Sequence, residues 1–161
     1  MKKEEYVWGS LRIGLGLIFL WAFFDKLLGL GFNTAADKSW LLGNSPTAGF
    51  LQFGVHGPFS TMFNALAGSV LVDWLFMLGL LLIGSSLILG IGVKISSYSG
   101  ALLLLLMWTA LLPPEHHPFL DDHIIYALLL IGLSLVKSGR FLGFGKWWSK
   151  QKLVKKYPLL E

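Results

Sequence analysis

Six ionisable side chains lie inside or at the ends of apolar stretches of this sequence, where their chemistry needs an explanation. A charge within a lipid bilayer is costly, and by default it indicates a functional site. The six residues are Arg12, Asp25, Lys26, Asp121, Asp122 and His123. They are the candidate site residues of the chain.

Three of the six, Lys26, Asp122 and His123, are candidates for a catalytic role. A histidine can gain or lose a proton near neutral pH, and a carboxylate beside it can help to relay that proton. Quinone reduction or oxidation needs this chemistry, because two protons accompany two electrons. If the segments around these residues are antiparallel helices, Lys26 meets Asp121 or Asp122 at the outer edge of the membrane. Asp25 then approaches His123.

The other three, Arg12, Asp25 and Asp121, are candidates for ligand binding. Arg12 lies about one turn inside the first apolar stretch. Its side chain either snorkels to the membrane surface or faces the other helices. In the second case it binds an acidic or carbonyl group of a ligand or of a partner helix. For Asp121 and Asp122 the alternative is simple capping, since aspartate suits a helix N-terminus.

Several kinds of redox site are excluded or disfavoured by the sequence. The chain has no cysteine, which excludes disulfides, thiol chemistry and cysteine-ligated metal or iron–sulfur sites within it. All the histidines belong to the predicted outer side, so a bis-histidine haem through the bilayer has no second ligand; they are His56, His116, His117 and His123. The proline-flanked pair among them does not resemble a zinc motif. We therefore expect no metal and no haem. Quinone is expected as the substrate and electron acceptor that the proton chemistry of His123 would serve.

Four apolar stretches would position these residues, and they predict an all-α integral membrane protein. The chain is 55% hydrophobic and 14% charged, with a mean hydropathy of +0.67, whereas roughly 25% of residues are charged in a soluble domain. A spanning helix needs about 20 residues. The predicted spans are residues 7–30, 74–93, 95–112 and 120–138. They form a four-helix bundle over residues 1–145, followed by a basic tail over residues 146–161.

The distribution of lysine and arginine predicts the orientation of these helices. With four spans, both termini and the Lys94 connection share one side. That side holds eleven of the thirteen basic residues, and only Lys26 and Lys38 lie on the other. The positive side is cytoplasmic. We therefore expect a multi-pass protein of a prokaryotic plasma membrane with cytoplasmic termini. The lysine-rich tail, with Trp147 and Trp148, either meets anionic lipid or only fixes the topology.

The first stretch is predicted to be a retained helix rather than a cleaved signal peptide, because charged residues interrupt it. The second and third stretches are joined only by the tight connection over residues 93–97, so they form an antiparallel hairpin. Glycines in and between the stretches are predicted to serve close helix packing. They are Gly14, Gly16, Gly79, Gly84, Gly90, Gly92 and Gly100.

The first outer loop, about residues 31–69, is predicted to contain two short helices in the plane of the membrane interface. Ser45 and Pro46 suit the cap and first turn of one helix. Pro58 begins the second, and Gly68 ends it. The apolar face of this second helix is expected to pack on the bundle or to enter the interface; it consists of Phe59, Met62, Phe63 and Leu66.

Short motifs spread over about residues 7–137 carry a family resemblance. They are Arg12-Ile-Gly-Leu-Gly-Leu-Ile-Phe-Leu through Asp25-Lys26-Leu, Pro58-Phe59 to Ala67-Gly68, Asp73-Trp74-Leu75 to Ile83-Gly84 and Leu89-Gly90, and Phe119-Leu120-Asp121-Asp122-His123. The chain resembles the DoxX family, and within it the DoxD-like small membrane subunit of thiosulfate:quinone oxidoreductase. The resemblance implies a membrane subunit that acts with a second protein subunit and passes electrons to quinone. It also implies that Arg12, Lys26, Asp122 and His123 are the polar residues of interest.

The predicted function is therefore a membrane subunit of a quinone-linked oxidoreductase of the thiosulfate:quinone type, inactive alone, with its polar site at the outer ends of the first and fourth helices. The expected partners are membrane lipid, quinone and a second protein subunit, with no nucleic acid. The alternative is a non-enzymatic bundle that binds lipid or anchors a partner protein. The two functions predict different surroundings for Lys26, Asp122 and His123. These residues line a cavity in the quinone-linked function, whereas in the alternative they only cap a helix and pair with one another.

Overall fold

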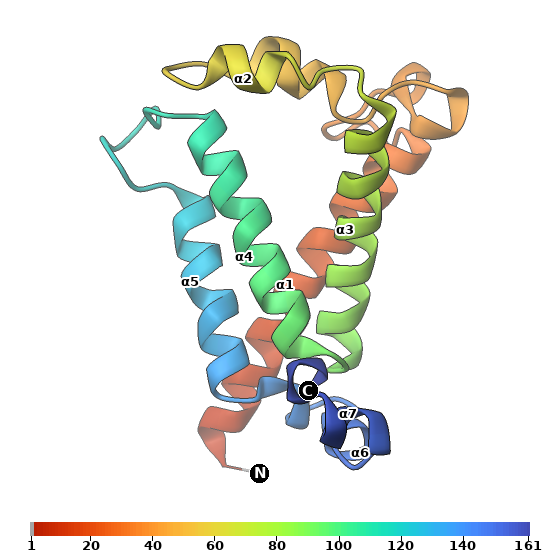
Figure 1. The fold of residues 1–161 in the computed structure, drawn as a ribbon, viewed down its shortest axis with the longest axis vertical. Coiled ribbons are helices and arrows are strands. Elements are labelled where there is room, and N and C mark those ends of the chain that lie inside the picture. The colour runs from red at the N-terminus through yellow and green to blue at the C-terminus, as the bar shows by residue number, and fades with distance from the viewer. Residues whose placement is uncertain (1) are drawn as a thin grey trace.

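The computed structural model describes residues 2–161, and every regular element in that range is a helix. Four longer helices run roughly along the long axis of the molecule (Figure 1). They are α1 (Lys3–Leu28), α3 (Val70–Leu89), α4 (Val93–Ala110) and α5 (Asp122–Leu135). The N- and C-terminal ends of the chain lie at the same end of the molecule, called here the terminal end, and the opposite end is called the loop end.

Three of these helices, α1, α3 and α4, are long and apolar enough to cross a membrane. Their bounds agree with the first three predicted spans to within four residues. The fourth helix, α5, is shorter than predicted, with 14 residues, which correspond to about 21 Å of helix. It begins at the acidic residues and ends before the first lysine that follows. The all-helical class is confirmed, and three helices could span a membrane by length and composition, whereas α5 is shorter than the roughly 20 residues that a span needs.

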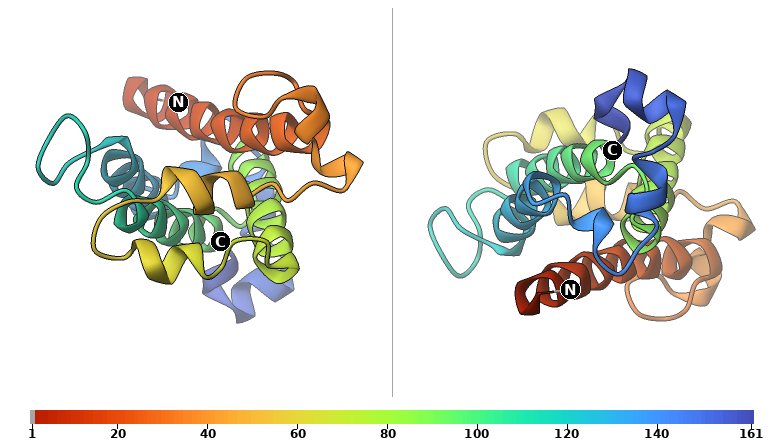
Figure 2. Two further views of the ribbon diagram at one scale, coloured as in Figure 1. Left: turned by 90° about the horizontal axis from the view of Figure 1, so that it is seen from above. Right: turned by 90° about the horizontal axis from the view of Figure 1, so that it is seen from below.

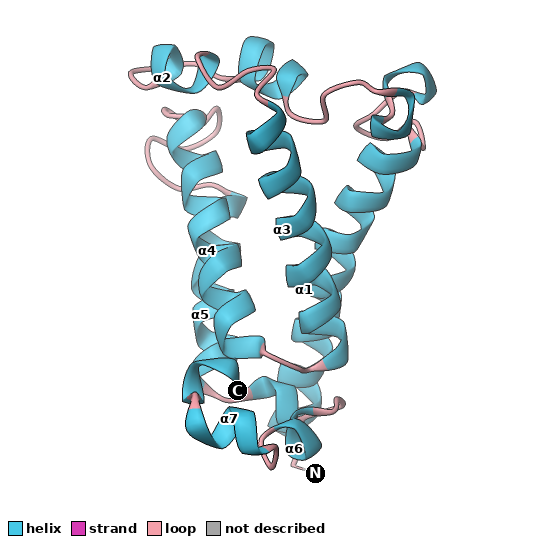
Figure 3. Cartoon of the chain, turned by 45° about the vertical axis from the view of Figure 1, so that its right-hand side comes forward, coloured by secondary structure: helices cyan, strands magenta, loops and turns pink. Residues whose placement is uncertain are grey.

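The four helices form two pairs, α1 with α3 and α4 with α5. The α1–α3 contact depends on two glycines. A Cβ atom on Gly16 would lie 3.0 Å from the carbonyl oxygen of Gly84, and a Cβ on Gly84 would lie 3.0 Å from that of Gly16. At the loop end, α1 leans away from α5 (Figures 1 and 3). The packing role predicted for glycine is therefore confirmed at these two positions and at Gly100, where a Cβ would lie 2.9 Å from Cδ1 of Leu130 on α5. At Gly14 and Gly79 a Cβ would meet no atom within 4 Å.

The connection between α3 and α4 is as tight as predicted but lies three residues earlier. Gly90 and Gly92 adopt φ values of +73° and +65°, which glycine reaches without the steric cost that a side chain brings. As a result Lys94 is in the first turn of α4 rather than in the turn itself.

The loop end is covered by the first long loop, which lies across the ends of the helices (Figure 2). In the second half of this loop, Ser45 acts as the predicted cap, because the Ser45 Oγ accepts from the Ala48 backbone N–H at 3.0 Å. The two regular pieces that follow are shorter than expected, a π-helical turn η3 (Phe50–Gly54) and α2 (Ser60–Asn64). Phe63 is buried as predicted, in a small core with Leu51, Val55 and Ala110. The remaining predicted face is at least 40% exposed; it consists of Phe59, Met62 and Leu66.

The residues after α5 are folded against the terminal end of the bundle rather than extended (Figure 2). They form η4 (Ser138–Arg140), α6 (Gly145–Trp148), α7 (Lys152–Lys156) and η5 (Pro158–Leu160). Val154 is 3% exposed, and the backbone N–H of Lys94 donates to the carbonyl of Glu161 at 2.9 Å. The basic tail is therefore a packed part of the fold.

Candidate functional site

Arg12 is completely buried and binds backbone carbonyls from two other parts of the chain. Its Nη1 donates to the carbonyls of Leu87 and Ile88 on α3, the second at 3.1 Å. Its Nε and Nη2 donate to three carbonyls that follow α5: Ser138 at 3.2 Å, Phe141 at 2.8 Å and Leu142 at 3.0 Å. A guanidinium group has five N–H donors, so five contacts use all of them.

These contacts complete the C-terminal end of α3. The last four carbonyls of a helix have no partner within the helix, and in α3 they belong to residues 86–89. The carbonyl of Ser86 accepts from the N–H groups of residues 90 and 91, and that of Leu89 accepts from the Phe144 N–H. Arg12 supplies donors for the two between them. A cation at this end also interacts favourably with the helix dipole. Arg12 thus faces a partner helix, the snorkelling alternative is wrong, and no N–H remains for a ligand.

Asp25 fixes the start of the long loop. It is 1% exposed, and its carboxylate oxygens accept from the backbone N–H groups of Phe32 at 3.2 Å and Asn33 at 2.9 Å. The chain reverses between them at Gly29, where φ is +68°. The carboxylate therefore serves the fold locally.

The ion pair predicted between Lys26 and an aspartate is wrong. Within residues 2–161 the side-chain ion pairs within 4.0 Å do not include Lys26. Its Nζ instead lies 6.0 Å from the centre of the Phe76 ring on α3, at the limit of a cation–π contact. The physical reason is that α1 leans away from α5 at the loop end (Figure 1).

Asp121 and His123 are brought together at the start of α5. Asp121 caps the helix, as its alternative assignment predicted, because its Oδ1 accepts from the backbone N–H groups of His123 at 3.0 Å and Ile124 at 3.3 Å. Its Oδ2 lies 2.7 Å from Nδ1 of His123. Asp122, in the first turn, is exposed. Of the predicted cluster, only one carboxylate is thus in contact with the histidine.

One buried carboxylate that holds the long loop was not singled out from the sequence. Asp73, 6% exposed near the start of α3, accepts from Ser45 Oγ at 2.8 Å and Thr47 Oγ1 at 2.6 Å. The sequence signal for it was an acidic residue within the apolar segment that precedes the second predicted span, together with a loop that is rich in hydroxyl groups. Because α3 begins at Val70, Asp73 lies inside the helix rather than at its boundary.

A groove runs between α1 and α5 with a volume of about 540 Å³. Its lining is almost entirely apolar and comprises Tyr6, Val7, Ser10, Leu11, Gly14, Leu15, Ile18, Tyr126 and Leu129. A Cβ atom on Gly14 would meet nothing within 4 Å, so this glycine leaves the groove open. The sequence carried no signal for this site, because its two walls lie more than a hundred residues apart.

On α5 the groove is lined by Tyr126 and Leu129, close in sequence to the Asp121–His123 pair. Tyr126 lines it, and His123 is three residues earlier on the same helix, which places both side chains on one face. Tyr126 is half-buried, and within residues 2–161 its hydroxyl makes no hydrogen bond to the protein, so the hydroxyl is free to bind a ligand. The Asp121–His123 pair therefore lies about one helical turn from Tyr126, which lines the apolar groove.

Comparison with protein-family models, curated proteins and solved structures finds no match to this chain. In residues 2–161 no three histidine or carboxylate side chains are grouped so that they could hold a metal ion. The geometry therefore carries the functional argument.

Proposed function

We propose that this protein is a membrane subunit of a quinone-linked oxidoreductase and that it binds quinone in the groove between α1 and α5. The groove is the observation that carries the proposal. Its volume of about 540 Å³ lies within the range of roughly 300–1,000 Å³ for small-molecule sites. Apolar walls suit an isoprenoid tail, and the Tyr126 hydroxyl can donate to a ring carbonyl. The thiosulfate:quinone type is the form that the resemblance to the DoxX family implies.

In this proposal His123 exchanges protons with the bound quinone. Reduction of a quinone to a quinol takes up two electrons and two protons. The electrons come from a redox centre on a second protein subunit, and the protons pass through His123 and Tyr126 from the loop end. Asp121 orients the imidazole through the contact at Nδ1. Lys26 and Asp122 are not part of this path, because Lys26 lies against α3 and Asp122 faces outward.

We also propose that α5 is a fourth membrane span, with both termini on the cytoplasmic side of a prokaryotic plasma membrane. The packing of α5 along α4 supports this topology. So does the position of both chain ends at the same end of the molecule as the tight α3–α4 connection (Figure 1). Lipid and a second subunit are then the expected neighbours of the bundle.

Photochemical labelling with a quinone that carries an azide group tests the binding site. We expect labelled peptides from α1 and α5 in the wild-type protein. Gly14→Leu places a side chain in the groove at a position where a Cβ meets no other protein atom within 4 Å. It should reduce labelling about tenfold or more, since a steric conflict of 1.4 kcal/mol already has that effect. Gly79→Leu is the matched control, because its Cβ also meets nothing within 4 Å but lies on α3. Equal labelling of both variants would refute quinone binding in the groove.

A second candidate function, lipid binding or partner anchoring without catalysis, is favoured by a different observation. Three of the candidate residues already have their polar atoms engaged by the protein: Arg12, Asp25 and Asp121. His123→Ala separates the two functions in membranes that contain the cognate second subunit. If the variant folds normally but loses quinone-linked turnover, the result supports the proton path through His123. If the variant keeps full turnover, the result excludes that path and favours the non-catalytic function.

A further inference from the structure

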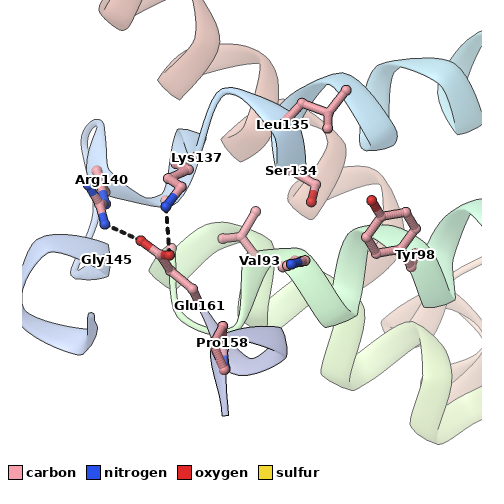
Figure 4. A pocket seen from close by; sticks show the side chains of 12 residues that line it. Val93, Tyr98, Ser134, Leu135, Lys137, Arg140, Gly145, Pro158 and Glu161 are labelled. Atoms are coloured by element: carbon pink, nitrogen blue, oxygen red, sulfur yellow. Dashed lines mark hydrogen bonds and ion pairs between the residues drawn. The ribbon is translucent and has the colours of Figure 1, made fainter. Parts of the chain in front are cut away.

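A polar cavity lies at the terminal end of the bundle, at the opposite end of α5 from His123 (Figure 4). Its volume is about 280 Å³. The start of α4, the residues that follow α5 and the last residues of the chain form its walls. Three basic side chains, Lys94, Lys137 and Arg140, line it together with one carboxylate, Glu161. The formal charge of the four groups is therefore 3 − 1 = +2.

The Glu161 carboxylate occupies the basic part of this cavity. Its Oε2 accepts from Lys137 Nζ at 2.9 Å, and its Oε1 accepts from Arg140 Nη2, as the dashed lines in Figure 4 mark. Burial raises the pKa of the Glu161 carboxyl, but the hydrogen bonds and charges of Lys137 and Arg140 outweigh it and lower the pKa below its ordinary value of 4.5. An anion is thus already held at this place by groups that bind anions well.

Glu161 leaves other donors of the cavity unused. Ser134 is 9% exposed, and its hydroxyl faces the cavity, toward the Tyr98 hydroxyl (Figure 4). Neither hydroxyl has a hydrogen-bond partner within residues 2–161, and Tyr98 is 44% exposed. Arg140 Nε is buried and also has no partner. A buried donor without a partner, as Arg140 Nε is, is rare in a folded protein and suggests a missing ligand or water.

We propose that this cavity binds a phosphate group and that the Glu161 side chain is its displaceable internal occupant. A phosphate monoester carries a charge of about −1.5 to −2 and three acceptor oxygens, which matches a basic cavity with unused donors better than one carboxylate does. The planar guanidinium of Arg140 can bind two of those oxygens at once. The site is independent of the groove, so it stands whether or not the quinone proposal holds.

The phosphate can belong to a lipid headgroup or be free in solution. The neighbouring tail favours contact with a membrane surface, because it carries several lysines beside Trp147 and Trp148, and the Trp147 side chain is exposed. Indole rings and lysines are typical of the headgroup region. Phosphatidic acid, which presents a phosphate monoester at that depth, is therefore the lipid probe to use, and inorganic phosphate is the soluble one.

The test compares three variants of the full chain in lipid nanodiscs, with and without phosphatidic acid, and in detergent with inorganic phosphate. Arg140→Gln should weaken binding about tenfold or more, as expected when a hydrogen-bonded charge is lost. Glu161→Gln removes the competing charge, so it should strengthen binding several-fold, which misfolding cannot imitate. Lys150→Gln removes one positive charge from an exposed position outside the cavity and should change binding less than twofold.

Binding to phosphatidic acid alone identifies a headgroup site, and binding to both probes identifies a general phosphate site. Either result, with the stated order of variants, supports the proposal. It is overturned if neither probe binds, if Glu161→Gln does not strengthen binding, or if Lys150→Gln weakens binding as much as Arg140→Gln. The last result would show that the general charge of the surface, and not the cavity, attracts the phosphate.

Discussion

Replacing Arg12 with methionine tests whether one side chain joins the ends of three helices. The variant keeps a long side chain but loses all five hydrogen bonds. Four of the five carbonyls that Arg12 binds have no other donor within residues 2–161; they belong to Leu87, Ile88, Phe141 and Leu142. The variant therefore leaves these carbonyls without a partner at the terminal end of the bundle.

The size of the effect follows from the number of carbonyls. A buried polar group left without a partner costs about 1–3 kcal/mol, so four such groups correspond to about 4–12 kcal/mol before the structure relaxes. Even the lower end is a large fraction of the roughly 5–15 kcal/mol that stabilises a typical folded protein. For a chain of this length, about 4 kcal/mol lowers the unfolding midpoint by about 10 °C or more. Arg12→Lys keeps the charge but offers only three donors, so its unfolding midpoint should lie between those of the wild type and Arg12→Met.

Thermal unfolding in mild detergent, followed by tryptophan fluorescence, measures these differences. Lys150→Met is the matched control because it removes a positive charge from an exposed position of the tail, and its midpoint should equal that of the wild type. If Arg12→Met unfolds at the wild-type midpoint, the hydrogen bonds of Arg12 do not hold the helices together and this reasoning is wrong.

Three further predictions concern the loop, the tail and the topology. Asp73→Ala removes the acceptor for two loop hydroxyls and should increase protease cleavage within residues 45–67. Asp37→Ala changes an exposed loop position and should not increase cleavage. Equal cleavage of the two variants would contradict the anchoring role of Asp73. The folded-state pKa of Glu161 is lowered, so its stabilisation of the tail is present above the ordinary value of 4.5 and is lost as the pH falls through the folded value. Protease release of the tail should therefore rise in acid for the wild type but show no such step for Glu161→Gln, and the same step in both would exclude this carboxyl as the cause. A reporter fused after Glu161 should remain cytoplasmic and one inserted near Lys38 should be translocated, whereas the reverse pattern would contradict the proposed topology.

The sequence predicted the helices well because long uncharged runs leave few alternatives to a helix in a membrane. It predicted the depth of each charged residue along its helix, but not its lateral position. Lys26 and His123 were both placed correctly near the loop end, yet α1 leans away from α5 there (Figures 1 and 3). Antiparallel order alone does not make two helix ends adjacent, so the predicted ion pair did not form.

The partners of Arg12 and Asp73 could not be predicted from the sequence, for a different reason. Arg12 stood out as a charge inside an apolar stretch, but carbonyl partners have no residue type by which to recognise them. Asp73 binds hydroxyls that lie 26 and 28 residues earlier, and no spacing rule connects positions so far apart. Local caps were accessible, as Ser45 and Asp121 show, because their partners lie within three residues.

The quinone content of the purified protein tests the central proposal most directly. The wild type, Gly14→Leu and Gly79→Leu are isolated from their native membranes in mild detergent, and bound quinone and phospholipid are quantified by mass spectrometry after extraction. Our account predicts about one quinone per chain in the wild type and in Gly79→Leu, and a loss of most of it in Gly14→Leu. A wild-type protein that carries phospholipid but no quinone, or a Gly14→Leu variant that retains as much quinone as the wild type, would contradict it.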